Sequence, residues 1–428
     1  MASIPVTPSG SLPLTHAVFV QAISVEEEFS PAWHSASAGL ATLRLVDRWL
    51  DEGAAATRAD RWALRSVRKA VDRLAEDDPQ RLILSGIVEL IATSSTVDMD
   101  LLAPRLLAYG HALDLEGRFP LAVDVLRTVV LYVHPAKHAD VAADANMRLG
   151  FCLRMLGLLE EAGAAYSAAG NLARSMGDTA RLLRARVADG KLALARGNLP
   201  AAASILDEVV DAAAADHELS ELRATALHDR AAVAFAAGEH EAAVHYAFAA
   251  LEGTIRPVAR DRVLADLATM LIQLGAHDSA RDALVVLSSG AQEQYTRWMA
   301  QVNLMELAVV EGAELVFESH RRALMNAPLP VELEANYHLH AGFGFHAFGR
   351  ADAAATALRR ALALATTHSL NQLIFQAEKA LELVERSRAR IVRRVPAPPP
   401  VAHIPASLAH VTNAIRELRE LGDLAGAT

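Results

Sequence analysis

The sequence is poor in the residues on which disulfide frameworks and cysteine-based metal sites depend. Of 428 residues one is cysteine, and aromatic residues make up 5%. The lone Cys152 excludes an intramolecular disulfide and any site built from several cysteine ligands. Proline (17) and glycine (23) are too few for a collagen-like chain, and an apolar content of 52% is too high for a disordered one.

Long apolar runs and early positive charges are also missing. No basic residue precedes Arg44, so the apolar run over residues 14–20 lacks the charged start of a secretory signal, and it is too short to cross a bilayer. A formal net charge of −10 argues against nucleic acid as the main partner, because such a partner requires a basic face. We therefore expect a soluble, cytoplasmic protein with no membrane span.

What the sequence does contain is an internal repeat of 37 to 41 residues, marked by glycine. The marking glycines are Gly117, Gly157, Gly197, Gly238, Gly275, Gly312 and Gly349. Five residues after each glycine stands alanine, with one exception: Ala122, Ala162, Ala202, Ala243, Ala280, Phe317 and Ala354. Seven residues before each glycine stands a second, mostly small residue: Gly110, Gly150, Gly190, Ala231, Ala268, Met305 and Gly342.

This spacing predicts seven pairs of antiparallel helices. Apolar residues between the marks follow helical periodicity, and glycine tolerates the positive φ at which a helix commonly ends. Small residues on both sides of the turn allow the two helices of a pair to approach closely. Because one pair cannot bury its apolar stripe alone, we expect the pairs to stack into an all-α, right-handed superhelical solenoid.

The sixth unit departs from this pattern. Its close-contact positions are Met305, Phe317 and Leu324, where regular units have small residues in at least two of three. Larger side chains at a helix crossing force the helices apart or change their crossing angle. The sequence therefore predicts that the sixth helix pair is the irregular one.

Three segments carry a resemblance to the tetratricopeptide repeat (TPR): AYGHALDLEGRFPLAVDVL from Ala108, LGFCLRMLGLLEEAGAAY from Leu149 and ADGKLALARGNLPAAASIL from Ala188. The resemblance covers about residues 103–385, in units longer than the usual 34 residues. These units are similar to the longer-helix variants of bacterial regulators and cytoskeletal adaptors. The resemblance implies a scaffold for protein–protein interaction, and it specifies architecture far better than ligand.

The composition divides the chain into five parts. We expect a flexible N-terminal segment over 1–32, an irregular helical cap over 33–97, and the solenoid with its C-terminal capping helix over 98–395. A proline-rich linker over 396–406 and an amphipathic helix with a tail over 407–428 follow. Within the first part, residues 14–25 are expected as a short strand or an extended segment.

The last helix needs a surface to cover its apolar face, which a single line of aliphatic residues forms: Leu408, Val411, Ile415, Leu418 and Leu421. A helix this short is marginal alone in water. The linker is long enough for this helix to reach a groove of the last repeats, and we expect the helix to dock there. A partner protein, or a second copy of the chain, is the alternative.

The search for reactive chemistry finds no catalytic motif. Gly342 and Gly344 form Gly-x-Gly, but inside a helical repeat and after no strand, which argues against a nucleotide site. His134 and His138 lie in a loop, and three further histidines share no helical face: His338, His340 and His346. We therefore expect no metal, no cofactor and no enzymatic activity.

Two further features have bland interpretations. Cys152 lies in mid-helix beside a small packing position, which favours an inert, buried thiol. A basic run precedes the proline linker: Arg386, Arg388, Arg390, Arg393 and Arg394. We interpret it as a solvated helix end, and a docking patch for an acidic partner or anionic membrane is the alternative.

The first helix of each unit is expected to line a concave groove, as it does in proteins of this family. The candidate binding residues on it are His111, Met147, Phe151, Arg154, Arg184, Lys191, His228, Phe235 and Phe343. The Lys/Asn clamp of chaperone-binding relatives is absent, because its positions hold other residues, including His111 and Phe151. If the helical phase is off by one, these candidates are core residues instead.

The leading hypothesis is a non-enzymatic scaffold that binds a partner segment on the concave face. The alternative is a sensory or regulatory TPR module that binds a peptide or small molecule and acts through a partner protein. An enzyme or metalloprotein hidden in the irregular first 100 residues is the third, weakest possibility.

Overall fold

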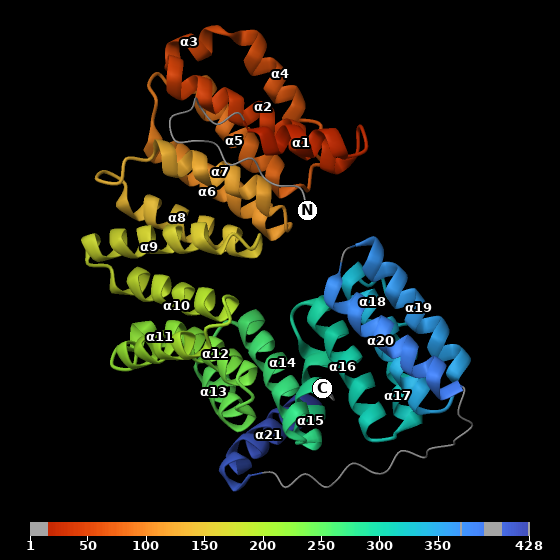
Figure 1. Cartoon of the computed structure of the whole chain (residues 1–428). Helices are drawn as coiled ribbons and strands as arrows, with labels where there is room; N and C mark the ends of the chain where they lie inside the picture. The colour runs from red at the N-terminus through yellow and green to blue at the C-terminus, as the bar shows by residue number, and fades with distance from the viewer. Residues whose placement is uncertain (1–15, 369, 389–404, 427–428) are drawn as a thin grey trace. The chain divides into compact units, whose positions relative to one another are not determined.

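The computed structural model describes residues 16–368, 370–388 and 405–426, and this part of the chain is helical and contains no strand (Figure 1). It divides into two compact units, residues 1–205 and 206–428, with the boundary inside α11 (Leu199–Ala212). The expectation of an all-α fold is confirmed.

The helices of the first unit form an N-terminal group of five and the beginning of the repeat. The N-terminal group is α1 (Ala17–Val25), α2 (Pro31–Glu52), α3 (Ala54–Ala59), α4 (Arg61–Val71) and α5 (Pro79–Thr93). The repeat begins with α6 (Met99–Leu115), α7 (Phe119–Tyr132), α8 (Ala139–Met155), α9 (Leu159–Met176) and α10 (Thr179–Ala195).

The second unit continues the repeat after the 3-10 turn η1 (His217–Leu219). Its paired helices are α12 (Ser220–Ala236), α13 (His240–Gly253), α14 (Pro257–Leu274), α15 (His277–Gly290), α16 (Gln294–Val310), α17 (Glu314–Leu324), α18 (Val331–Ala347) and α19 (Ala351–Thr367). The chain then adds α20 (Asn371–Arg388), a second 3-10 turn η2 (Ala406–Leu408) and α21 (Ala409–Gly426).

Every predicted glycine turn is present and has the same geometry. The seven glycines lie in the left-handed region, with φ between 70° and 81°. In each turn the residue after the glycine donates its amide hydrogen to the carbonyl four residues before the glycine, at 2.7–2.9 Å, as from Arg118 to Leu113. This bond satisfies a carbonyl at the end of the first helix and reverses the chain. The helices α6 to α19 therefore form seven TPR-like pairs.

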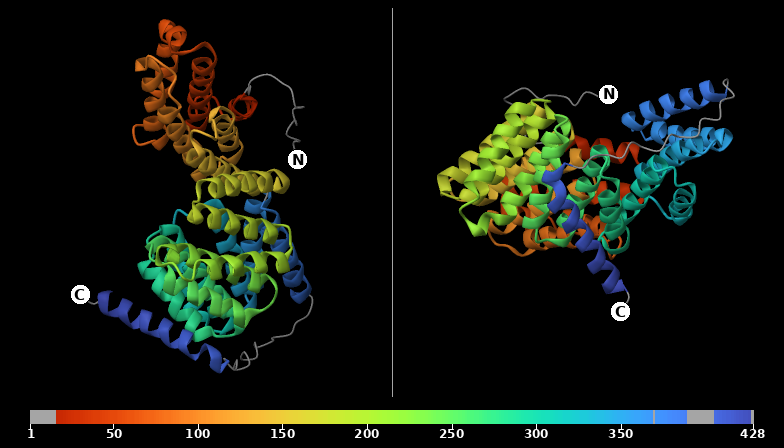
Figure 2. Two further views of the ribbon diagram at one scale, coloured as in Figure 1. Left: turned by 90° about the vertical axis from the view of Figure 1, so that its left-hand side faces the viewer. Right: turned by 90° about the horizontal axis from the view of Figure 1, so that it is seen from below.

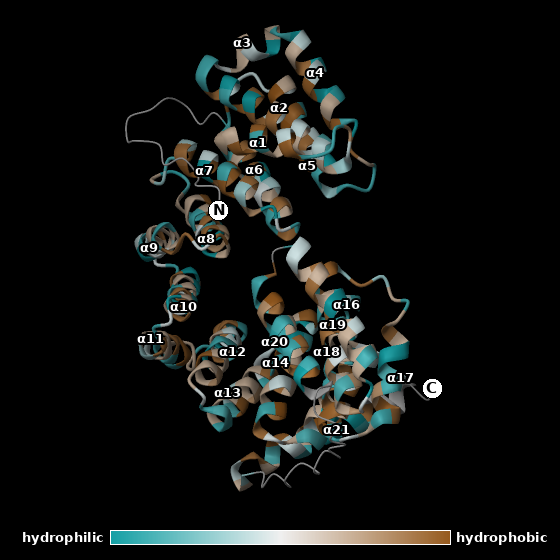
Figure 3. Cartoon of the chain, turned by 45° about the vertical axis from the view of Figure 1, so that its right-hand side comes forward, coloured by the Kyte–Doolittle hydropathy of each residue, from teal (hydrophilic) through white to brown (hydrophobic). Residues whose placement is uncertain are grey.

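The small positions are buried or tightly packed within the helix pairs. The six alanines five residues after the glycines are fully buried. A Cβ on Gly150 would lie 2.5 Å from the ring of Tyr166, and one on Gly342 would lie 2.5 Å from Leu358. In both pairs a glycine in the first helix leaves space for a large side chain of the second helix. Figure 3 shows how apolar and polar residues share the helix surfaces.

The N-terminal group corrects one expectation. Residues 14–25 were expected as a strand or extended segment, but Ala17–Val25 forms the helix α1, which packs on α2 and α7. Phe19 is fully buried there, so at least this part of the expected flexible segment is anchored. The helix brings Phe19 to the surfaces of α2 and α7, and the sequence of the segment alone does not contain those distant contacts. Residues 1–15 lie outside the described part.

The C-terminal helix docks on its own unit, but not where the sequence argument placed it. η2 and α21 pack on α13 and α15, the second helices of the fourth and fifth pairs, rather than on the last repeats (Figure 2). Leu408, Val411 and Ile415 are fully buried in this contact. The beginning of the apolar face of this helix is thus covered. The helix α20, at the place where a capping helix was expected, packs on α18 and α19. Residues 389–395, the end of the expected solenoid with its cap, and residues 396–404 of the expected linker lie outside the described part.

Candidate functional site

The nine candidate residues all lie on first helices, and none of them is buried. Six belong to the first unit: His111, Met147, Phe151, Arg154, Arg184 and Lys191. The other three belong to the second unit: His228, Phe235 and Phe343. Because side chains at these positions are half-buried or exposed, they are not core residues.

In the first unit the structure brings only some of these candidates together. Arg154 lies over the ring of Phe151, 5.6 Å from its centroid, and Phe119 meets the same ring edge-on. His111 contacts Asp114 and Arg148 instead of another candidate. The candidates of this unit therefore do not converge on one pocket.

Consecutive first helices are joined by acid–base pairs that sequence reasoning missed. Arg148 donates to Asp114 at 2.6 Å, and Arg181 of the next repeat donates to Asp144 at 3.0 Å. In the second unit, His228 Nε2 lies 2.7 Å from Asp266. The partners stand 34, 37 and 38 residues apart, close to one repeat length. Opposite charges separated by about one repeat length in the sequence could have indicated these pairs.

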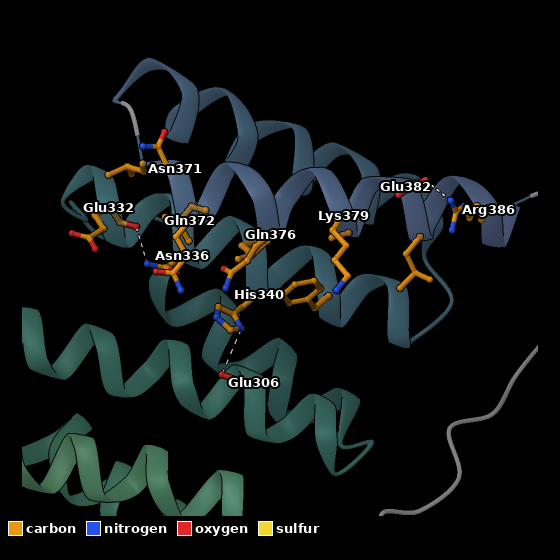
Figure 4. Close-up of a pocket in the computed structure, with 16 residues that line it drawn as sticks. Glu306, Glu332, Asn336, His340, Asn371, Gln372, Gln376, Lys379, Glu382 and Arg386 are labelled. Carbon is orange, nitrogen blue, oxygen red and sulfur yellow. Dashed lines mark hydrogen bonds and ion pairs between the residues drawn. The ribbon is translucent and has the colours of Figure 1, made fainter. Parts of the chain in front are cut away.

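The most developed site is a pocket in the second unit, between α16, α18 and α20 (Figure 4). Its volume is about 860 Å³. Two first helices of the repeat and the capping helix supply its walls. The lining residues are Glu306, Glu332, Asn336, Leu339, His340, Phe343, Leu370, Asn371, Gln372, Leu373, Gln376, Lys379, Ala380, Glu382, Leu383 and Arg386.

Carboxamides dominate the polar lining at one end of this pocket. Asn336 of α18 and Gln372 and Gln376 of α20 lie on facing helices in Figure 4. Each carboxamide can donate and accept hydrogen bonds, and the amide of Asn336 already donates to the carbonyl of Glu332 at 3.2 Å. Such a lining suits a ligand that carries both donors and acceptors.

Aromatic and charged groups form the middle and the other end of the pocket. His340 meets Phe343 edge-on at 5.8 Å, and Phe343 is 38% exposed. Burial lowers the pKa of His340, while Glu306, 3.8 Å away, opposes that shift. His340 Nδ1 is buried without a hydrogen-bond partner in the described part of the chain.

Of the cations in the pocket, Arg386 pairs with Glu382. No ion pair or hydrogen bond joins the Lys379 ammonium to another described residue. Figure 4 shows the Lys379 side chain reaching toward the pocket, which Phe343 also lines. An ammonium without a partner among the described residues, in a pocket that an aromatic ring also lines, favours an anionic group on the ligand.

Of the nine candidate binding residues from the sequence, Phe343 is among the sixteen that line this pocket. Sequence reasoning overlooked Asn336 because few positions were considered on each first helix, and it considered His340 only as a metal ligand. It overlooked Gln376 and Lys379 because α20 follows the last repeat and was assigned only a capping role. Continuing the repeat phase into α20 was the signal that could have found them.

A second cavity of about 900 Å³ lies beside the sixth pair, where α17 ends after only 11 residues. Its wall includes Leu324, Leu329 and Tyr337. The arginines that line it are engaged, Arg360 with Glu334 at 2.9 Å and Arg321 with Glu318 at 3.0 Å. This cavity therefore offers apolar surface, and the arginines that line it already have carboxylate partners.

The remaining reactive candidates are enclosed in the fold. Burial raises the pKa of Cys152 to about 12, and the side chain is fully buried. Gly342 and Gly344 lie inside α18, where their missing side chains admit Leu358 and Phe317. Within the described residues, no three His, Cys, Asp or Glu side chains are grouped as metal ligands.

The structure describes the beginning of the basic run. Arg386 pairs with Glu382, while Arg390, Arg393 and Arg394 lie outside the described residues, as does the side chain of Arg388. Among the described helices, none is both long and apolar enough to cross a bilayer.

No family model and no curated protein matches the chain. Solved structures match at low identity, and the three described next have 12–16% identity. A tetratricopeptide repeat protein from Parabacteroides merdae has 16% identity and a TM-score of 0.44, over 66% of this chain and 98% of the other. The apo quorum sensor NprR from B. thuringiensis has 12% identity and a TM-score of 0.49, over 82% and 92%.

A third similar structure is a Rap protein complexed with competence and sporulation factor, with 13% identity and a TM-score of 0.47 over 85% and 92% of the two chains. All three values describe a distant likeness between helical-repeat proteins. They say nothing about the ligand of this chain.

Proposed function

We propose that this chain is a non-enzymatic interaction module that binds an extended peptide segment of a partner protein in the pocket between α16, α18 and α20. The observation that carries the proposal is the composition of that pocket. Facing carboxamides, an exposed aromatic ring and an unpaired ammonium lie along two helices. First helices line the concave face in solenoids of this kind, where extended partners bind.

The polar groups match a peptide backbone better than a compact apolar ligand. An extended strand presents alternating N–H and C=O groups along its length, and Asn336, Gln372 and Gln376 can donate to the one and accept from the other. The ring of Phe343 offers an apolar contact for one side chain. Binding through such groups needs no catalytic residue.

The charges give the peptide a direction. Glu332 lies at the end of the pocket near the start of α18, and Lys379 of α20 lies farther along the pocket, beyond Gln376 (Figure 4). A basic group or N-terminal amine is favoured near Glu332, and an acidic side chain or C-terminal carboxylate is favoured near Lys379. From Glu332 to Phe343 the helix rises about 16 Å, the length of roughly five extended residues.

The second candidate is a sensory role with a small-molecule ligand, and the pocket volume favours keeping it. About 860 Å³ lies within the range of small-molecule sites, roughly 300–1,000 Å³. A small polar molecule with an acidic group would use His340 and Lys379 without spanning the carboxamides. Substitution of Gln372 would then have little effect on binding.

The test is direct binding of extended peptides of about five residues, which vary in charge at both ends, by isothermal titration calorimetry. We expect acidic C-terminal ends to bind best. Phe343→Ala should weaken binding at least about tenfold, a loss of about 1.4 kcal/mol. Phe375→Ala is the control, because Phe375 is a more exposed aromatic residue of α20, at 66% against 38% for Phe343, and it does not line the pocket.

Charge reversal tests the predicted direction. Lys379→Glu should reverse the preference at the acidic end, whereas Lys137→Glu in the first unit should leave it unchanged. If no peptide binds, or if Phe343→Ala and Phe375→Ala lose affinity equally, the pocket is not the binding site. A third outcome is that Gln372→Ala leaves ligand affinity unchanged while Lys379→Glu abolishes it. The carboxamides then take no part in binding, and the small-molecule role is favoured.

A further inference from the structure

The cavity beside the sixth pair lies where α17 stops early. This helix has 11 residues, whereas the second helices of the other six pairs have 14 to 18. The difference from the next shortest is about one helical turn. Met325 and Leu329 of the connection to α18 line the cavity in its place. The sixth repeat therefore has a hollow where a longer helix would have placed side chains.

The inner wall of this cavity is apolar and partly aromatic. Leu324, Ala341 and Ala357 are buried in it, and Tyr337 is 6% exposed. The half-buried ring of Phe345 also lines it. Concave apolar walls with aromatic rings are typical of small-molecule sites, and the volume of about 900 Å³ lies within the range of such sites.

The arginines that line the cavity are engaged by the protein itself. Arg360 pairs with Glu334 at 2.9 Å. Arg321 pairs with Glu318 at 3.0 Å and lies over the ring of Phe345, 5.5 Å from its centroid. A charged ligand would have to compete with these contacts and lose its own hydration, whereas an uncharged ligand would not. The charge distribution therefore favours an uncharged ligand.

One polar side chain of the lining is suited to orient such a ligand. His338 is half-buried, and its Nε2 lies 3.8 Å from Glu334, too far for a hydrogen bond. Burial lowers the pKa of His338, so its imidazole is uncharged at pH 7. A neutral imidazole offers one N–H donor and one acceptor nitrogen. It can therefore hold one hydroxyl, carbonyl or amine group of a ligand.

The cavity and the pocket proposed for peptides lie on different faces of α18. Tyr337, Ala341 and Phe345 line the cavity at intervals of four residues. Leu339 and Phe343, also four residues apart, line the pocket. Residues at this spacing share one face of a helix. The two linings have no described residue in common, so the cavity can be filled whether or not the pocket is occupied.

We propose that the cavity beside the sixth pair is a second binding site, which takes an uncharged aromatic small molecule with one hydrogen-bonding group. Its rings pack against Tyr337 and Phe345, and its polar group meets His338. The arginines keep their carboxylate partners. The site is independent of peptide binding, because it uses the other face of α18.

A matched pair of fluorescent probes tests the site in the full chain. N-phenyl-1-naphthylamine is uncharged and carries two aromatic groups and one N–H, and 8-anilinonaphthalene-1-sulfonate adds a sulfonate to the same skeleton. We expect the uncharged probe to bind at one equivalent, with enhanced emission and a dissociation constant in the micromolar range. The sulfonate should bind at least about tenfold more weakly, because the arginines of the lining are already paired.

Variants locate the bound probe. Ala353→Trp should weaken binding of the uncharged probe at least about tenfold, because Ala353 is half-buried in α19 and lines the cavity. Ala363→Trp is the matched control at an exposed position of the same helix. Leu329→Asp places a charge in the cavity and should also weaken binding, whereas Leu315→Asp, at an 87% exposed position of α17, should not.

Four results would overturn the proposal. The uncharged probe fails to bind up to its solubility limit, or the sulfonate binds as tightly. Ala353→Trp binds the probe as well as Ala363→Trp does, or Phe343→Ala, in the pocket, weakens probe binding more than Ala353→Trp. Circular dichroism checks the fold of each variant. If Ala353→Trp is unfolded, the comparison of Leu329→Asp with Leu315→Asp decides, and equal affinity of these two variants contradicts the site.

Discussion

The ring of Phe317 in α17 occupies the space that a side chain on Gly344 in α18 would need. A Cβ built at residue 344 would overlap three ring carbons of Phe317. Phe317 is fully buried and also meets the rings of Phe345 and Phe348, at 5.8 and 5.5 Å. The large residue that makes the sixth repeat irregular in sequence is thus accommodated by a glycine of the seventh. How far the sixth pair departs from the others stays a prediction.

The first prediction is that Gly344→Ala destabilises the second unit, although alanine is the better helix former by about 1 kcal/mol. The added carbon has no space beside Phe317, and overpacking of a dense core costs roughly 1–3 kcal/mol. We expect a lower urea midpoint with an unchanged slope in circular dichroism. Gly290→Ala is the control, because a Cβ there would meet nothing within 4 Å.

Combining Gly344→Ala with Phe317→Leu should recover part of the loss, since the smaller side chain vacates the contested space. If Gly344→Ala is as stable as Gly290→Ala, Phe317 has room to move and the two residues are not coupled.

The second prediction concerns His16, which is buried between two carboxylates. Its Nδ1 lies 2.5 Å from Asp124 of α7, and its Nε2 lies 2.8 Å from Asp47 of α2. Burial alone would lower the pKa of His16, but the hydrogen bonds to Asp124 and Asp47 outweigh it and raise the pKa from 6.5 to about 9. The imidazolium therefore ties the start of α1 to two other helices.

Because the folded pKa lies above the unfolded one, the stabilisation is complete below pH 6.5 and is lost as the pH rises through about 9. The difference of about 2.5 pKa units corresponds to roughly 3 kcal/mol. We expect the free energy of unfolding of the first unit to fall by up to that amount between pH 6.5 and pH 10. Urea unfolding at several pH values measures it. His16→Gln should remove most of this slope, and an unchanged slope would contradict the assignment.

The glycine spacing predicted the repeat because its cause is local. A helix that must reverse within three residues needs positive φ, and the buried alanines after the turn follow from close packing in the same pair. The helix α1 and the position of α21 were predicted wrongly because both depend on distant surfaces. Phe19 finds its cover on α2 and α7, and Val411 finds its cover on α13 and α15.

For the candidate site too, local features could be predicted from the sequence and features that depend on distant surfaces could not. Burial agrees with the helical phase that placed Phe151 and Phe343 outside the core. The pocket itself depends on α20, whose Gln376 and Lys379 face α18 only because the capping helix packs as a further first helix would. No spacing within one repeat contains that information.

The third prediction is that Ala162→Leu destabilises the first unit by roughly 1–3 kcal/mol through overpacking. Ala162 is fully buried at the crossing of α8 and α9. Since stacked repeats share interfaces, we also expect a broader thermal transition in circular dichroism. Ala164→Leu is the matched control, because Ala164 is exposed on the same helix. Equal melting of the two variants would mean that the crossing relaxes without cost.

The fourth prediction is that Cys152 resists alkylation until the first unit opens. The thiol is fully buried in α8, and burial raises its pKa to about 12, so almost no reactive thiolate is present at pH 8. Iodoacetamide at pH 8 should therefore leave the native protein unmodified by intact-mass spectrometry. Labelling should begin at the urea concentrations that unfold the first unit, because local opening supplies the thiolate. A variant with Ser167→Cys places a second thiol at an exposed position of α9 and should gain a single label at once. Two labels on this variant under native conditions would show that the packing around α8 opens without unfolding, and the interpretation of Cys152 as an inert thiol would then be wrong.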